Sequence, residues 1–126
     1  MQKKTGVILD QVVGAVVTHF RVKVAQLSQQ QAVEGLSIGT SSLSRLEKGD
    51  YSLNMGQLFE LSSNLGVTMT QIINSIEKTC DEITKNGIYI AQEKKTNTKL
   101  LLLSTDSIAQ MVQANLAQTT ELEKSH

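Results

Sequence analysis

The sequence predicts a mainly helical protein, and three observations lead to this expectation. The 126-residue chain has no proline, no tryptophan, two phenylalanines and two tyrosines, a composition that argues against a large β-sandwich. Apolar residues make up 40% of the chain, enough to fill a core and exclude wholesale disorder. In most segments they recur at intervals of three and four, the period of helices that bury one face. This length suits one domain, or one small domain with an appendage.

The first two helices are predicted before Gly35. Over residues 7–25, apolar side chains such as Val12, Val16 and Phe20 recur at helical spacing. A second, short helix begins at Ser28, which forms an S-x-x-Q capping box with Gln31.

A tight turn over residues 35–39 separates the second helix from the third. Gly39 is an acceptable N-cap for a helix over residues 40–48, whose apolar face consists of Leu43 and Leu46. The pattern therefore predicts two short helices that pack across a turn.

Two further helices complete a bundle of five. Gly49 ends the third helix, and Asn54 caps a fourth helix that Gly66 closes. Thr68 and Gln71 form another capping box, which opens a longer fifth helix with one continuous apolar stripe.

The C-terminal part is predicted to be a small β-hairpin followed by a helix. Residues 88–91 and 99–103 are short apolar runs separated by a polar segment, a pattern typical of paired strands. Thr105 or Asp106 is expected to cap the last helix. We therefore divide the chain into a helical domain (1–76), a C-terminal dimerisation region (77–118) and a flexible tail (119–126).

Composition excludes several classes of protein. The 12 basic and 12 acidic residues give a net charge of zero, so any DNA binding must be local rather than driven by overall charge. No apolar run is long enough to cross a bilayer, and Asp10 interrupts the only run that resembles the start of a secretory signal. A single cysteine, Cys80, cannot form an internal disulfide. We expect a cytoplasmic protein.

Catalytic and metal-binding patterns are not recognisable in the sequence. The two histidines, His19 and His126, are far apart, and Cys80 has no second cysteine or histidine partner to activate it. We therefore expect no enzymatic activity, no metal and no cofactor.

Three strings carry a resemblance to a known family: LSQQQAV, SSLSRLEKGD and LFELSSNLGVTMTQII. Together, from Ser28 to Ile73, they resemble the Cro/CI-type, or XRE-type, helix-turn-helix regulators. The resemblance implies a lambda-repressor-like fold whose third helix enters the major groove of double-stranded DNA.

The resemblance also implies two sets of DNA-contacting residues. The residues expected to face base edges are Thr40, Ser41, Ser44 and Arg45. The residues expected to contact phosphates are Gln29, Ser42, Lys48, Tyr51, Ser52 and Asn54. Glu47 is expected to be structural, because phosphates would repel a carboxylate aimed at them.

The chain departs from the family pattern at three positions. Val33 stands where a small alanine is usual between the two helices, and Ser37 where a glycine with positive φ is usual. Arg21 is one residue further from Ser28 than the usual arginine, so we expect the turn over residues 23–27 to be one residue longer.

The C-terminal part is too small to form a core of its own, so we expect it to join two copies of the chain. The residues expected at this homodimer interface are Ile83, Ile88, Tyr89, Ile90, Leu101, Leu103, Ile108, Met111, Val112 and Leu116. The alternative is that this part folds back on the helical bundle of its own chain.

Together these observations predict a homodimeric bacterial or phage transcriptional repressor that binds a palindromic operator and regulates its own gene. One alternative is the antitoxin of a toxin–antitoxin pair, whose C-terminal part binds a protein partner. The other is a helical protein-interaction module that does not bind DNA.

Overall fold

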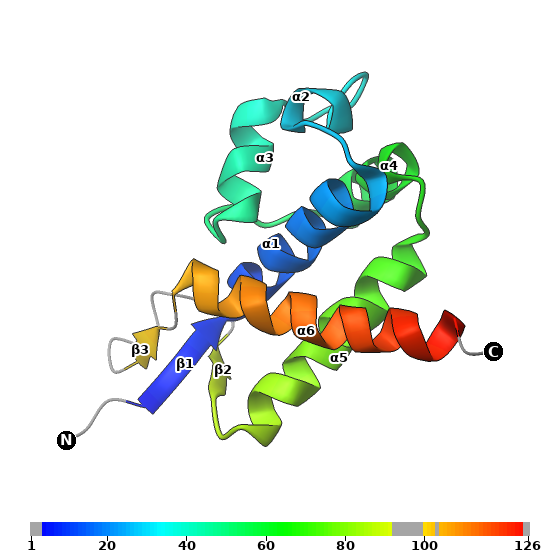
Figure 1. Cartoon of the computed structure of the whole chain (residues 1–126). Helices are drawn as coiled ribbons and strands as arrows, with labels where there is room; N and C mark the ends of the chain where they lie inside the picture. The colour runs from blue at the N-terminus through cyan, green and yellow to red at the C-terminus, as the bar shows by residue number, and fades with distance from the viewer. Residues whose placement is uncertain (1–3, 92–99, 103, 125–126) are drawn as a thin grey trace.

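The computed structural model describes residues 4–91, 100–102 and 104–124 (Figure 1). The chain is mainly helical, with a small parallel sheet near its N-terminus. The elements in chain order are β1 (Lys4–Ile8), α1 (Leu9–His19), the π-helical segment η1 (Phe20–Ala25), α2 (Gln29–Ala32), α3 (Thr40–Glu47), α4 (Met55–Leu65), α5 (Met69–Lys85), β2 (Tyr89–Ala91), β3 (Leu100–Leu102) and α6 (Thr105–Lys124).

The N-termini of α2, α4 and α5 are where the capping patterns place them. The side chains of Ser28, Asn54 and Thr68 each accept a hydrogen bond from the backbone N–H three residues later. The glutamine three residues after each cap accepts one in return from the N–H of the cap residue. These boxes confirm the predicted starts of α2, α4 and α5.

The sheet differs from the predicted hairpin. Its strand order is β2-β1-β3, and β1 pairs in parallel with both neighbours. The two C-terminal strands therefore flank β1 instead of pairing with each other, and the hairpin prediction is wrong. In parallel pairs, Val7 lies opposite Ile90 and Thr5 opposite Leu101.

The first helix also begins later than predicted. Val7 and Ile8 belong to β1, and α1 begins at Leu9. Both residues are buried, so their apolar character is consistent with either element. Their strand pairing depends on residues more than eighty positions away, which local periodicity does not reveal.

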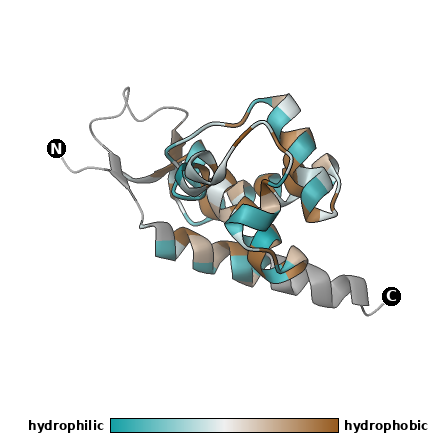
Figure 2. Cartoon of the chain, turned by 90° about the horizontal axis from the view of Figure 1, so that it is seen from above, coloured by the Kyte–Doolittle hydropathy of each residue, from teal (hydrophilic) through white to brown (hydrophobic). Residues whose placement is uncertain are grey.

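Helix α1 runs through the middle of the molecule and packs against α3, α5 and α6 (Figure 1). Val12, Val16 and Val17 are fully buried in a core that also includes residues of α3, α4, α5 and α6. Along the coloured, N-terminal part of α6, hydrophobic and hydrophilic residues alternate as the helix turns (Figure 2), as expected of a helix with one buried face.

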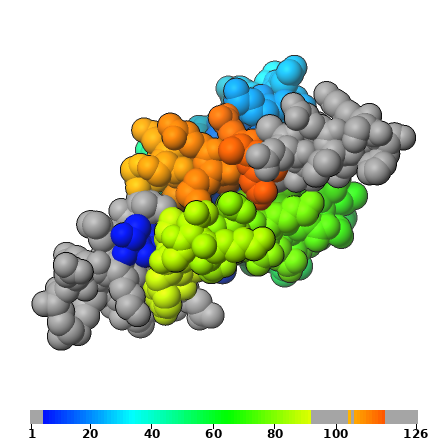
Figure 3. Space-filling view, turned by 60° about the horizontal axis from the view of Figure 1, so that its bottom comes forward, coloured from blue at the N-terminus to red at the C-terminus, as the bar shows by residue number. Residues whose placement is uncertain are grey.

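The C-terminal part folds back on the helices of its own chain. Helix α5 runs without a break through residue 76, where we placed the domain boundary. Helices α5 and α6 lie side by side on one face of the molecule (Figure 3). Ile83 of α5 and Ile108 of α6 belong to the same core as Val12 of α1. The described residues therefore share one apolar core.

This packing removes three residues from the expected dimer interface. Ile83, Ile108 and Val112 are fully buried within the single chain, so their side chains are not available to a second copy. Their burial agrees with the alternative in which the C-terminal part folds back on the helical bundle of its own chain.

The ends of α6 also differ from expectation. Ser104, not Thr105 or Asp106, caps the helix, because its Oγ accepts a hydrogen bond from the N–H of Ser107. The helix extends to Lys124, past residue 119 where we expected a frayed tail. Among the described residues, no helix is long and apolar enough to span a membrane.

Gly14 sets the distance between α1 and α3. It is buried, and a Cβ placed on it would collide with the carbonyl oxygen of Leu46 and lie 3.0 Å from that of Glu47. We expect Gly14→Ala to lower the free energy of unfolding by about 1–3 kcal/mol, because the two helices must separate. Urea denaturation measures this change.

Gly56 provides the matched control. It lies on the exposed surface of α4, where an added Cβ would meet only Asn54 Oδ1 at 3.4 Å. Gly56→Ala should leave the stability unchanged or raise it, because alanine favours helices. Equal stability of Gly14→Ala and the wild-type protein would contradict the proposed close contact.

Candidate functional site

The turn between α2 and α3 is fixed by helix α4. The side-chain amide of Asn64 donates hydrogen bonds to the carbonyls of Ala32 and Glu34, each at 2.9 Å. The Glu60 carboxylate accepts hydrogen bonds from both the backbone N–H and the hydroxyl of Ser37. Helix α4 thus anchors both ends of the turn, a role that local patterns did not indicate.

The left-handed residue of this turn is Gly35, with φ 76°, and not Ser37. Ser37, at the position where a glycine with positive φ is usual, therefore carries no left-handed strain. Val33 is accommodated in the core between the helices, with 8% of its surface exposed.

Helix α3 has one apolar face and one polar face. Leu43 and Leu46 are fully buried, and they direct the opposite face outward. Thr40, Ser41 and Arg45 are exposed and Ser44 is half-buried. The structure therefore brings all four residues expected to contact bases onto the outward side of α3. In Figure 1, α3 lies on the other side of α1 from α6.

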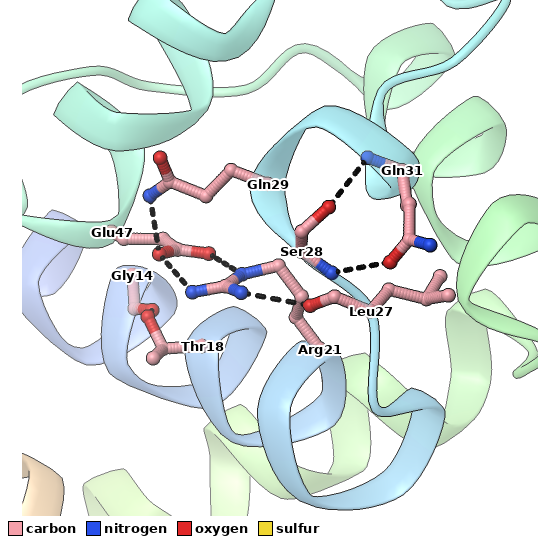
Figure 4. A network of polar contacts seen from close by, with 8 residues as sticks. All are labelled: Gly14, Thr18, Arg21, Leu27, Ser28, Gln29, Gln31 and Glu47. Carbon is pink, nitrogen blue, oxygen red and sulfur yellow. Dashed lines mark hydrogen bonds and ion pairs between the residues drawn. The ribbon is translucent and has the colours of Figure 1, made fainter.

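A largely buried ion pair connects α3 to η1, the segment that follows α1. Arg21 Nε lies 2.6 Å from Glu47 Oε2, and Arg21 Nη2 lies 2.9 Å from Glu47 Oε1 (Figure 4). The two side chains are 14% and 9% exposed. Two parallel bonds between planar groups fix orientation as well as distance. The structural role expected for Glu47 is confirmed by these contacts.

Two more segments join the same network. Arg21 Nη1 donates to the carbonyl of Leu27 at 2.9 Å, and Gln29 Nε2 donates to Glu47 Oε1 at 3.0 Å (Figure 4). Glu47 therefore holds η1, the loop after it, α2 and α3 in one arrangement.

The backbone between Arg21 and Ser28 takes an unusual path. Segment η1 is π-helical, and Gln26 after it has φ 57°, the only positive φ of a non-glycine residue among those described. A π-helix closes its turns with i→i+5 bonds and so contains more residues per turn than an α-helix. Residues 23–27, where we expected a longer turn, comprise the end of this π-helical segment and the two residues after it.

Arg45 is held at the end of α3 by the loop that follows. Its Nη2 donates to the Asp50 carbonyl at 3.2 Å, and its Cζ lies 5.9 Å from the centre of the Tyr51 ring. This is within the range of a cation–π interaction. The exposed Arg45 side chain therefore has two partners, Asp50 and Tyr51, in the loop after α3.

The residues expected to contact phosphates differ in how available they are. Lys48 is exposed and Ser42 is half-buried. The amide nitrogen of Gln29 already donates to Glu47. The side-chain oxygen of Asn54 caps α4, and the Tyr51 hydroxyl accepts a hydrogen bond from Gln57.

Ser52 lies beside a carboxylate. Burial raises the pKa of the Asp10 carboxyl, and a hydrogen bond from the Ser52 side chain offsets part of that rise. A neighbouring carboxylate makes Ser52 the least suitable of the expected phosphate contacts, because it repels anions.

Of the other residues expected at a dimer interface, only some have described side chains. Tyr89 is exposed, whereas Ile88, Ile90 and Met111 are half-buried. Leu103 and the side chains of Leu101 and Leu116 lie outside the described residues.

The described residues contain no group of three histidine, cysteine, aspartate or glutamate side chains able to hold a metal ion. Burial and the nearby charge of Lys23 lower the pKa of His19, which favours its neutral form. Burial, Asp81 and Glu77 raise the pKa of the Cys80 thiol, the opposite of what a nucleophilic thiolate needs.

Comparisons with known proteins give no relative for this chain. No family model, curated protein or solved structure matches it.

The Arg21–Glu47 pair allows a direct test of the network. We expect Glu47→Ala to lower the free energy of unfolding by about 3 kcal/mol, because Arg21 would remain buried without its counter-charge. The double variant Arg21→Met, Glu47→Leu should be less destabilised, because no buried charge remains. Denaturant unfolding measures both.

Glu77→Ala is the control, since it removes an exposed carboxylate from α5 and should change stability by less than about 0.5 kcal/mol. If Glu47→Ala were no more destabilising than Glu77→Ala, the pair would not hold α3 in place.

Proposed function

We propose that this chain is a sequence-specific DNA-binding transcriptional regulator, in which α2 and α3 form a helix-turn-helix unit of the Cro/CI type. The observation that supports this most is the outward face of α3, which presents Thr40, Ser41 and Arg45 to solvent while its leucines are buried. The resemblance of residues 28–73 to that family gives the same expectation.

The chemistry of this face suits the floor of the major groove. A helix that enters the groove presents its N-terminal residues to base edges. Thr40 and Ser41 lie in the first turn of α3, and their hydroxyls can both donate and accept hydrogen bonds. Arg45 can contact guanine O6 and N7 together, which contributes about 1–3 kcal/mol of discrimination.

Phosphate contacts in this proposal are few. Lys48 is an exposed cation next to α3, and the Tyr51 hydroxyl can still donate its own hydrogen. Gln29 retains a second N–H after its bond to Glu47. With so few charges, a single copy should bind weakly and show a shallow dependence on salt.

A second copy would raise the affinity through effective concentration, and a palindromic operator would follow from twofold symmetry. We retain the homodimeric, self-regulating repressor as the proposed form. Its interface must use residues other than the buried Ile83, Ile108 and Val112, and Tyr89 on β2 is an exposed candidate.

One observation favours the protein-interaction alternative. Met55 and Phe59 lie four residues apart on α4 and are 63% and 61% exposed, a pairing of large apolar side chains on one helix face. If Phe59→Ser removes a co-purifying protein while DNA selection fails, the chain is a protein-interaction module that does not bind DNA.

Arg45→Ala is the main test of DNA recognition. Fragments are first selected from random duplex DNA with the wild-type protein, and the dissociation constants for the selected and random duplexes are then compared. We expect the variant to lose about tenfold or more of its preference for the selected duplex. Its thermal stability should change little, because Arg45 is exposed.

Lys78→Ala is the charge-matched control, because it removes an exposed cation from α5. It should leave the preference unchanged. Failure of the wild-type protein to enrich any sequence, or an unaltered preference in Arg45→Ala, would contradict the proposed function.

A further inference from the structure

Tyr51 is anchored from several directions. Its ring packs against the apolar core and is half-buried. Its hydroxyl oxygen accepts a hydrogen bond from Gln57 Nε2 at 3.0 Å. Gln57 is itself held by the capping box of α4, in which its backbone N–H and side-chain oxygen both bond to Asn54. The ring is thus a fixed surface beside α3.

Arg45 lies against this fixed surface. Its guanidinium carbon is 5.9 Å from the ring centre, and its Nη2 bonds to the Asp50 carbonyl at 3.2 Å. Asp50 in turn donates its N–H to the Arg45 carbonyl at 2.8 Å, which fixes the first residue of the loop against the end of α3. An otherwise mobile side chain is therefore restrained before any ligand arrives.

We propose that Tyr51 is the positioning residue for Arg45, and that this pair sets a preference for one guanine–cytosine base pair in the bound duplex. This inference rests on the proposed function and names the base that the site would read. Guanine is the base whose major-groove edge offers two acceptors, O6 and N7, to the guanidinium group.

The physical reason is conformational entropy. A free arginine side chain loses much of its rotamer freedom when it forms two bonds to a base. An arginine already held by a ring and a carbonyl loses less on binding, so more of the contact energy contributes to affinity. Of its five N–H groups, one is used by Asp50, which leaves others to donate to a base.

The two parts of Tyr51 then have separate roles. The ring, which its packing against the apolar core holds even without the hydroxyl, positions Arg45 and so affects sequence preference. The hydroxyl, which accepts from Gln57 and can donate its hydrogen to a phosphate, affects affinity for all sequences equally. Tyr51→Phe removes the hydroxyl alone, whereas Tyr51→Leu removes the aromatic face as well.

The first measurement uses duplex DNA. Dissociation constants are compared for a selected duplex and for versions in which each guanine–cytosine pair is changed in turn. We expect wild-type protein and Tyr51→Phe to discriminate at one such pair by about tenfold or more, and Tyr51→Leu to lose several-fold of that ratio. If Tyr51→Leu discriminates as well as Tyr51→Phe, the positioning role is overturned.

The second measurement needs no DNA. The chain has only two arginines, Arg21 and Arg45, so ¹⁵N relaxation of their Nε–Hε groups gives two signals. The Arg45 signal should report a restrained group in the wild-type protein and in Tyr51→Phe, and a mobile one in Tyr51→Leu. Arg21, in its ion pair with Glu47, should stay restrained in all three and shows that the variants are folded.

The two measurements distinguish the possible failures. If the wild-type protein selects no DNA sequence, the proposed function fails whatever the relaxation data show. If DNA is selected but Arg45 is equally mobile in all three proteins, only the positioning role of Tyr51 is overturned.

Discussion

The bidentate pair between Arg21 and Glu47 is the interaction on which the arrangement of the site depends. It connects the segment after α1 to the last residue of α3, and through Leu27 and Gln29 it also holds the loop and α2. A buried ion pair contributes little net stability compared with apolar residues of the same size. Its value here is geometric, because planar groups joined by two bonds fix orientation. Gly14 permits the close approach of α1 and α3 that this pair requires.

The orientation of α3 follows from this constraint. Leu43 and Leu46 are buried in the core, and the Glu47 carboxylate at the end of the helix is bound to Arg21. The loop after α3 is held by the hydrogen bond between Tyr51 and Gln57 of α4. Among the described residues, Arg45 is the residue of the polar face whose side chain has partners, and these are Asp50 and Tyr51 in the loop after α3. Such a surface, rigid in its backbone and polar in its side chains, is what the proposed binding to base edges needs.

Features that depend on nearby residues could be predicted from the sequence. The structure contains several such local patterns: the capping boxes at Ser28 and Thr68, the glycine after α3 and the leucine face of α3.

The sheet could not be predicted, because β1 pairs with strands some ninety residues away and its apolar residues continue the helical pattern of α1. The burial of Ile108 could not be predicted either, because it depends on α6 folding back against α1. The hydrogen bonds from Asn64 and Glu60 to the α2–α3 turn also connect residues far apart in sequence. Gly14 within an apolar helix was a visible sign of close packing, since glycine otherwise weakens a helix.

The central claim is that the outward face of α3 contacts double-stranded DNA. It is tested most directly by titrating ¹⁵N-labelled protein with a duplex selected from random sequences and following the backbone amide signals. The proposal predicts the largest changes in α3, the loop after it and the start of α2, with little change on the exposed face of α5. Changes confined to α5, α6 or the Met55–Phe59 face, with α3 unaltered, would contradict it.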